Sequence, residues 1–245
     1  MATSALLSHI TVPATAAKHT ATIIFVHGLG DTGAGWKFVA EDLGRHEKLR
    51  HVKWILPNAP KMRVTANSGM EMSSWFDIFA FDGSKGDDVQ GMQKTVSSLS
   101  QLISNEVDSG IPSERIVLGG FSQGAAMTLL TGLTTEWKLG GLVALSGRLP
   151  MQKELDSDPT LIKNTHFAQT PLFWGHGTAD PLVPFSRAET SVEFLRTKIG
   201  VKDTNGDSLV GLKFHAYAGM QHTACDVELE HLREWLSKAI PEESS

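Results

Sequence analysis

Short apolar runs alternate with longer amphipathic segments along most of this chain. A run such as Ile23-Ile24-Phe25-Val26 is apolar at every position, which is typical of parallel strands covered on both faces. Between these runs, apolar residues recur at three- and four-residue steps, as in helices with one buried face. The pattern predicts strands at residues 22–27, 52–56, 115–119, 142–146, 171–175 and 212–217, and helices at residues 87–108, 123–133, 186–199 and 224–240.

The alternation of strand and helix predicts an α/β fold with a mostly parallel central sheet and helices on both faces. No internal repeat and no linker rich in Pro, Gly or Ser divides the 245 residues. A single core can serve a chain of this length. We therefore expect one domain over residues 20–241, preceded by an N-terminal extension of residues 1–19.

Composition excludes some partners and favours a reducing compartment. The 22 Lys and Arg residues against 27 Asp and Glu residues give a net charge of −5. A surface that follows phosphates is normally basic, so we expect no nucleic-acid partner. Cys225 is the single cysteine, so the chain cannot form an intramolecular disulfide.

The N-terminal residues carry no recognisable targeting signal. Residues 1–17 contain no Lys or Arg, and Ser8, His9, Thr11 and Pro13 interrupt their apolar positions. A secretory signal needs a basic start and an unbroken apolar stretch. No apolar run approaches the ~20 residues of a membrane span. We expect a cytoplasmic protein, with presence in the nucleus left open.

The segment Gly120-Phe121-Ser122-Gln123-Gly124 has the context of a nucleophile elbow. A bare G-x-S-x-G is a weak signal, but here a predicted strand runs directly into it and a predicted helix leaves directly from it. In such an elbow the serine hydroxyl stands above the sheet edge, and the glycines allow close approach of strand and helix. The alternative is that Ser122 only caps the helix.

A serine nucleophile needs a base and an orienting acid, which follow it in the order acid, then histidine. Asp180 lies just past the strand predicted at 171–175, whereas Asp156, Asp158, Asp203 and Asp207 lie in polar connections. His222 lies in the loop before the last helix. His215 and His231 lie inside a predicted strand and a predicted helix. We predict a Ser122–Asp180–His222 triad, although Asp180 before a proline could also serve only as a turn residue.

The glycine-rich segment 27–33 follows the first predicted strand and suits an oxyanion hole. Its glycines would let the backbone near Leu29 approach a substrate, and the residue after the nucleophile, Gln123, would supply the second N–H donor. We read His27 as a structural residue of this loop.

The same segment also matches G-x-G-x-x-G, so a dinucleotide-binding oxidoreductase is a rival function. That rival needs an acidic residue near the end of the second strand, where this chain has Pro57-Asn58-Ala59-Pro60. His222 and Asp226 lack a third metal ligand at a convincing spacing. We expect no cofactor and no metal.

Residues 62–81 are rich in Met and aromatic residues and show neither helical nor strand periodicity. Adaptable methionines and flat aromatic rings suit a flexible apolar chain. Because the polar segment 148–169 is too short to cover a deep pocket, we expect residues 62–81 to do so. The predicted substrate-binding residues are Met70, Met72, Trp75 and Phe76, although part of this segment could simply fill the core.

Five ordered motifs resemble the acyl-protein thioesterase and lysophospholipase family of α/β-hydrolases. They are residues 25–33, Ser73-Ser74-Trp75-Phe76-Asp77, Gly119-Gly120-Phe121-Ser122-Gln123-Gly124-Ala125, Asp180-Pro181-Leu182-Val183-Pro184 and Gly219-Met220-Gln221-His222. The resemblance implies an α/β-hydrolase fold without a large lid domain. It also implies Ser122 as nucleophile, Asp180 as orienting acid, His222 as base, and Leu29 and Gln123 as oxyanion donors.

The resemblance implies cleavage of fatty acyl thioesters from S-palmitoylated proteins, with lysophospholipase or carboxylesterase activity on lipid esters as the alternative. Substrates would be S-acylated proteins or lipid esters, and transient membrane contact is compatible with either. A catalytically inactive lipid-binding protein is a third hypothesis. The chain lacks the N-terminal cysteine of some relatives, and Arg148 stands where we expect an apolar or aromatic residue. Oligomeric state is left open.

Overall fold

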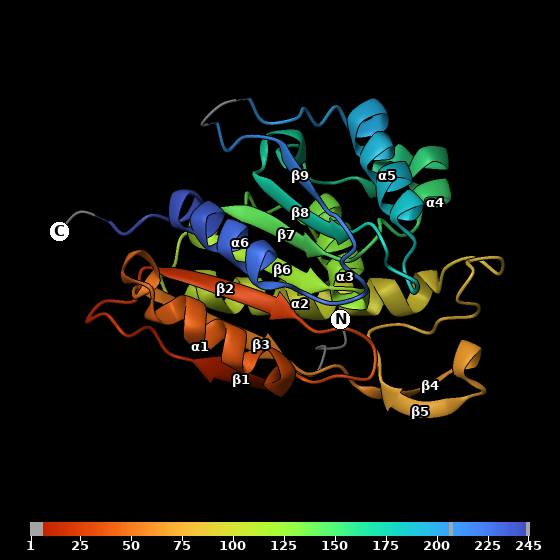
Figure 1. The fold of residues 1–245 in the computed structure, drawn as a ribbon, viewed down its shortest axis with the longest axis horizontal. Coiled ribbons are helices and arrows are strands. Elements are labelled where there is room, and N and C mark those ends of the chain that lie inside the picture. Colours follow the sequence, from red (N-terminus) through yellow and green to blue (C-terminus); the bar gives the residue numbers. More distant parts are fainter. Residues whose placement is uncertain (1–6, 206–207, 244–245) are drawn as a thin grey trace.

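A seven-stranded sheet forms the centre of the computed structural model, which describes residues 7–205 and 208–243 (Figure 1). The strand order is β1-β3-β2-β6-β7-β8-β9. β1 is antiparallel to β3, and the other neighbouring pairs are parallel. The strands are β1 (His9–Val12), β2 (Ala21–Val26), β3 (Val52–Pro57), β6 (Ile116–Phe121), β7 (Gly141–Leu145), β8 (Leu172–Gly177) and β9 (Leu212–Tyr217).

Helices cover both faces of this sheet. α1 (Lys37–Arg45) and α6 (Asp226–Ala239) lie on one face, and α2 (Val89–Asp108), α3 (Gln123–Thr134) and α5 (Phe185–Phe194) lie on the other, with the short α4 (Gln152–Ser157) near α5 (Figure 1). Shorter 3₁₀ turns occupy Gly33–Trp36, Glu47–Leu49, Thr65–Asn67, Ser113–Arg115, Pro159–Leu161 and Phe167–Gln169, and a π-helical turn, Leu195–Ile199, extends α5. No helix in the described ranges is long and apolar enough to cross a membrane.

Each face of the sheet has its own apolar core, which explains the uniformly apolar strands. Successive residues of a strand point to opposite faces. Ile24 packs with α2 and α3, whereas its neighbour Phe25 packs with α1 and α6. Both neighbours must therefore be apolar, and the polar alternation of a one-sided sheet is absent.

The predicted α/β class and mostly parallel sheet are confirmed. Each predicted strand and helix is present, with ends shifted by a residue or two when the π turn is counted with α5. Within the described part of the chain, the connection after β7 carries α4 and two single turns but no large lid.

The N-terminal boundary expected at residue 20 is wrong for residues 9–12, because these residues form β1 at the sheet edge. His9 pairs with Pro57 and Val12 with Trp54. Only Val12 of the four is buried, so the strand has too short an apolar pattern to be recognised in the sequence. Residues 1–6 of the expected extension lie outside the described residues.

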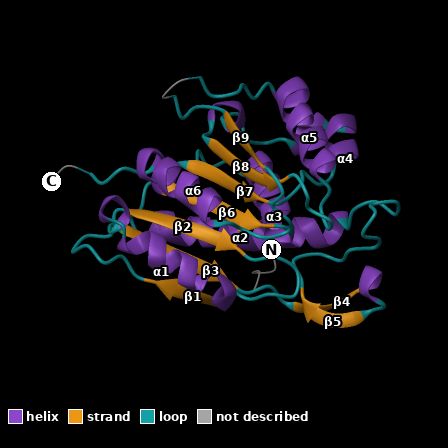
Figure 2. Ribbon diagram, viewed as in Figure 1, coloured by secondary structure: helices purple, strands orange, loops and turns teal. Residues whose placement is uncertain are grey.

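The connection between β3 and α2, residues 58–88, is the other departure from expectation. It contains a hairpin of β4 (Lys61–Val64) and β5 (Met70–Ser73) that stands apart from the main sheet (Figures 1 and 2). No strand was predicted here because most hairpin side chains are at least partly exposed and form no apolar face. Residues 74–88 then run as a loop to α2; we call them the 74–88 loop.

Candidate active site

Ser122 lies at a sharp turn between β6 and α3. Its backbone has φ 56° and ψ −115°, a region that residues with a side chain rarely occupy. A Cβ added at Gly120 would lie 2.4 Å from the carbonyl carbon of Gly124, and one at Gly124 would lie 2.0 Å from the Val26 carbonyl oxygen. Only glycine fits at both positions, so the motif forces the tight strand–helix packing that presents the serine.

The structure brings Ser122, His222 and Asp180 into one hydrogen-bonded chain. The Ser122 hydroxyl donates to His222 Nε2 at 2.8 Å. His222 Nδ1–H donates to Asp180 Oδ2 at 2.7 Å. In this arrangement the imidazole can take the serine proton while the buried carboxylate stabilises the resulting imidazolium.

The Asp180 carboxylate is held in place by its own loop. Its Oδ1 accepts hydrogen bonds from the Leu182 and Val183 amides at 2.8 and 2.9 Å. His176 Nε2–H donates to the Val183 carbonyl at 2.8 Å and lies 3.5 Å from Asp180 Oδ2. Burial lowers the pKa of His176, which keeps this imidazole neutral beside the triad. Sequence analysis did not identify His176, which lies on a buried strand.

Leu29 and Gln123 both line the cavity that contains Ser122. Within the described ranges, neither backbone amide donates a hydrogen bond to the protein. Gln123 is also the first residue of α3, so its amide lies at the positive end of the helix dipole. These two amides are therefore suited to an oxyanion that forms beside Ser122.

A cavity of about 290 Å³, which we call the Ser122 cavity, opens beside the triad. Its apolar lining includes Phe76, Ile78, Phe79, Phe81, Phe121, Ala126, Leu182 and Val183. Its polar lining includes Asp31, Asp77, Asp87, Arg148 and Arg187. Sequence analysis missed Leu182 and Val183, although an apolar pair directly after the acid was a usable signal.

Of the four predicted substrate-binding residues, only Phe76 lines this cavity. Met70 and Met72 lie on β5, and Met70 is 58% exposed on the hairpin. Trp75 is only 2% exposed and packs in the apolar core on the α2 and α3 side of the sheet. Hydrophobic content alone identified the right stretch of chain, but it could not separate the hairpin from the 74–88 loop, whose first half forms the apolar wall.

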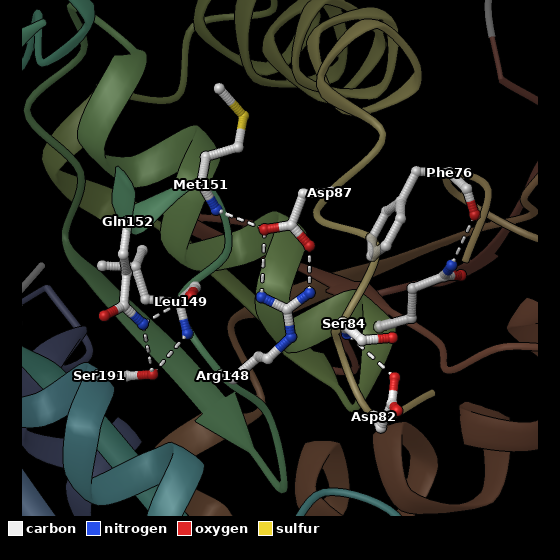
Figure 3. Close-up of polar contacts among 10 residues, drawn as sticks. Phe76, Asp82, Ser84, Asp87, Arg148, Leu149, Met151, Gln152 and Ser191 are labelled. Carbon is white, nitrogen blue, oxygen red and sulfur yellow. Dashed lines mark hydrogen bonds and ion pairs between the residues drawn. The ribbon is translucent and has the colours of Figure 1, made fainter. Parts of the chain in front are cut away.

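Arg148 and Asp87 form an ion pair in the cavity wall, shown in Figure 3. Both guanidinium nitrogens of the pair donate to the carboxylate, and the Met151 amide donates to Asp87 Oδ2 at 2.8 Å. Burial raises the pKa of Asp87, but hydrogen bonding and the charge of Arg148 lower it more, so it lies below its usual range. Arg148 therefore ties the connection after β7 to the end of the 74–88 loop.

The glycine-rich segment 27–33 does not offer a free dinucleotide site. The Gly33 amide, at the start of the 3₁₀ turn, donates to Asn58 Oδ1 at 2.9 Å. His27 is fully buried; its Nδ1–H donates to the Gly28 carbonyl, and its Nε2 accepts from the Ala59 amide. The Gly33 amide is therefore not free to donate to a cofactor phosphate. Among the described residues, no cluster of three or more His, Cys, Asp or Glu could hold a metal.

A search against protein-family models matches residues 7–240 to the phospholipase/carboxylesterase family. The chain is 47% identical over 228 residues to acyl-protein thioesterase 1 of Cryptococcus neoformans, covering 91% of this chain and 93% of that protein. It is 42% identical over 249 residues to acyl-protein thioesterase 1 of Neurospora crassa, covering 98% and 95%.

Solved structures give the same picture of the fold. Arabidopsis thaliana SOBER1 superposes with a TM-score of 0.80 at 29% identity, covering 90% of this chain and 99% of that one. Zea mays acyl-protein thioesterase 2 superposes with a TM-score of 0.78 at 27% identity, covering 95% and 99%.

Proposed function

Because the chain belongs to the phospholipase/carboxylesterase family of α/β-hydrolases, we propose that it is a serine hydrolase that cleaves fatty acyl thioesters of S-acylated proteins. The hydrogen-bonded chain from Ser122 through His222 to Asp180, at the edge of an apolar cavity, carries this proposal. The relatives named acyl-protein thioesterase support the choice of substrate.

The reaction proceeds by two acyl transfers on Ser122. His222 removes the serine proton as Ser122 Oγ attacks the thioester carbonyl, and the Leu29 and Gln123 amides stabilise the oxyanion. The tetrahedral intermediate collapses, the departing thiolate takes the proton from His222, and an acyl ester on Ser122 and a neutral imidazole remain. Water then attacks this ester with His222 again as base, and the fatty acid leaves.

The shape of the cavity supports a long acyl group. The apolar wall from Phe76 to Phe81 begins next to the nucleophile, so an acyl chain attached to Ser122 can pack along it. Each buried methylene contributes about 0.8 kcal/mol. Phe81 and Leu182 are 54% and 65% exposed, and both line the cavity. These exposed apolar side chains at the cavity mouth support transient contact with the membrane that holds acylated substrates. The protein itself would reside in the cytoplasm.

The test compares two substrates in parallel. An S-palmitoylated peptide and a palmitoyl lysophospholipid are assayed with wild type and with Ser122→Ala, and the folding of each protein is checked by thermal unfolding. The proposal predicts that the thioester is the better substrate and that Ser122→Ala loses several orders of magnitude in kcat on both, because the triad acts as a unit. A strong preference for the lysophospholipid would reassign the main substrate. Retention of more than about a tenth of kcat by Ser122→Ala would reject this nucleophile.

A further inference from the structure

Trp75 makes polar contacts that a residue serving only to fill the core would not need. It lies two residues after the hairpin, does not line the Ser122 cavity, and is almost completely buried. Its backbone N–H, backbone carbonyl and indole N–H all form hydrogen bonds. The carbonyl accepts from the Thr95 hydroxyl on α2, which anchors the residue to the helix layer. The two N–H groups point to two different segments.

The first of these segments carries Leu29. The Trp75 indole Nε1–H donates to the His27 carbonyl at 2.8 Å, and the centroids of the Trp75 indole and the His27 imidazole lie 5.0 Å apart. Two residues earlier, the Ser73 carbonyl accepts from the Gly30 amide at 2.8 Å. The Leu29 amide is thus bracketed by two hydrogen bonds to the same short stretch, residues 73–76.

The second segment carries Gln123. The Trp75 backbone N–H donates to Gln123 Oε1 at 2.9 Å. Gln123 Nε2 donates to the Ser74 hydroxyl and to the Phe76 carbonyl, both at 2.9 Å. This side chain is buried and fully engaged, while its backbone amide is left for the oxyanion. Figure 3 includes the bond to the Phe76 carbonyl.

We infer that residues 73–76, with Trp75 at their centre, are the positioning element of the oxyanion hole. They hold the Leu29 loop and the Gln123 helix start at a fixed separation, so that both amides meet one oxygen atom. Trp75 is a positioning residue and does not touch the substrate. The inference rests on the proposed function, since it needs an oxyanion at Ser122.

The expected effect is large because the two amides act only in the transition state. Loss of one oxyanion donor costs about 100- to 1000-fold in kcat, and displacement of reacting groups by ~1 Å costs up to about 100-fold. A loosened hole should therefore lower kcat and leave KM nearly unchanged. It should act equally on short and long acyl chains, because the oxyanion is the same in each.

The test is Trp75→Phe, which keeps an aromatic ring and removes the indole N–H. We expect kcat to fall about 10- to 100-fold for acetyl, octanoyl and palmitoyl thioesters alike. The inhibition constant of an acyl trifluoromethyl ketone, which forms an oxyanion on the serine, should rise by the same factor. Gln123→Met keeps the backbone amide, removes the side-chain bonds and should give the same pattern, which guards against a Trp75→Phe protein that fails to fold.

The matched control is Trp54→Phe. Trp54 is as buried as Trp75, but its indole nitrogen has no hydrogen-bond partner in the described part of the chain. This variant should lose stability to a similar extent and keep kcat within about twofold. Thermal unfolding of all variants measures the stability.

Two results would overturn the inference alone. One is an active wild type whose kcat is unaffected by Trp75→Phe. The other is a rise in KM that grows with acyl length at constant kcat, which would make Trp75 part of the acyl-binding wall. A wild type that hydrolyses no acyl ester and is not labelled at Ser122 by a fluorophosphonate would instead overturn the proposed function, and the inference with it.

Discussion

The two sides of the Ser122 cavity are built in different ways. Ser122, Asp180 and His222 lie on turns that follow β6, β8 and β9, so the parallel sheet places them at one edge. The opposite wall, from Phe76 to Phe81, lies in the 74–88 loop and is held by hydrogen bonds to the hairpin turn and to the residue that caps α2. Asp77, for example, accepts from the Thr65 amide at 2.7 Å and donates its own amide to Asp88 at 2.9 Å.

This contrast assigns different tasks to the two regions. The sheet edge fixes the reacting atoms, and changes there should affect every substrate by the same factor. In the proposed reaction the side chains of the loop wall pack against the acyl group, so changes to them should have effects that depend on acyl length. Each of the following experiments separates these behaviours.

The largest effect is expected for Asp180→Asn. The Leu182 and Val183 amides would still bind the side-chain oxygen, but the other atom would become an N–H₂ donor that faces His222. The imidazole would then be held in the wrong tautomer, which costs kcat a factor on the order of 10⁴. Kinetics on acetyl to palmitoyl thioesters should show the same loss at every length. A loss below tenfold would leave Asp180 as a turn residue only.

The sequence defined the sheet edge well because backbone geometry there depends on residue type. The elbow needs glycine at both positions because an added Cβ would lie 2.0 to 2.4 Å from backbone atoms. An acid in the turn after a parallel strand is placed at the same edge of the sheet as the elbow. The loop wall had no such local rule. Trp75 and Met70 are both apolar in the sequence, but hydrogen bonds to the Gln123 side chain and to the His27 carbonyl hold the first in the core, whereas the second is exposed on the hairpin. Those long-range contacts are not readable from periodicity.

Phe79→Asp and Met70→Asp test this revised view of the wall. Phe79 lines the cavity, whereas Met70 does not. We expect Phe79→Asp to lower kcat/KM for a palmitoyl thioester about 10- to 100-fold, since each methylene that loses burial costs about 0.8 kcal/mol. Acetyl thioester turnover should change less than about threefold. Met70→Asp should leave kcat/KM unchanged for both the palmitoyl and the acetyl thioester. A loss in this variant that equals that of Phe79→Asp and grows with acyl length would show that the hairpin is part of the acyl-binding site.

The Arg148–Asp87 pair joins the two regions, so its removal should have an intermediate effect. Arg148→Leu leaves a half-buried carboxylate, and Asp87→Asn leaves a half-buried guanidinium. Each single variant should lose about 1–3 kcal/mol of unfolding free energy, and the double variant should recover most of it. Urea unfolding of the four proteins measures this coupling. Strict additivity would show that the pair does not hold the loop.

The smallest effect on activity is expected for Glu228→Gln, behind the sheet edge. Glu228 is fully buried against Gly175 and Tyr217, neither carboxyl oxygen has a partner among the described residues, and burial raises its pKa to about 8. The folded state therefore holds a proton that the unfolded state loses above its ordinary pKa near 4.5. Wild-type stability should fall as pH rises from about 4.5 to about 8, by about 1.4 kcal/mol per unit.

The Gln variant lacks this titration, so it should match wild type at pH 4 and be the more stable protein at pH 9. Its kcat at pH 7 should stay within about twofold. Thermal unfolding across this pH range gives the difference. Parallel stability profiles for the two proteins would show that Glu228 is ionised when folded.

Isolation of the acyl-enzyme tests the central claim most directly. Wild-type protein is mixed with a palmitoyl thioester, quenched in acid within milliseconds, digested and analysed by mass spectrometry. The account predicts one palmitoyl group in ester linkage on Ser122, which forms in the first turnover and disappears as free palmitate accumulates. Free palmitate with no acyl group on Ser122, or an acyl group on Cys225 that is formed and hydrolysed at the rate of turnover, would contradict it.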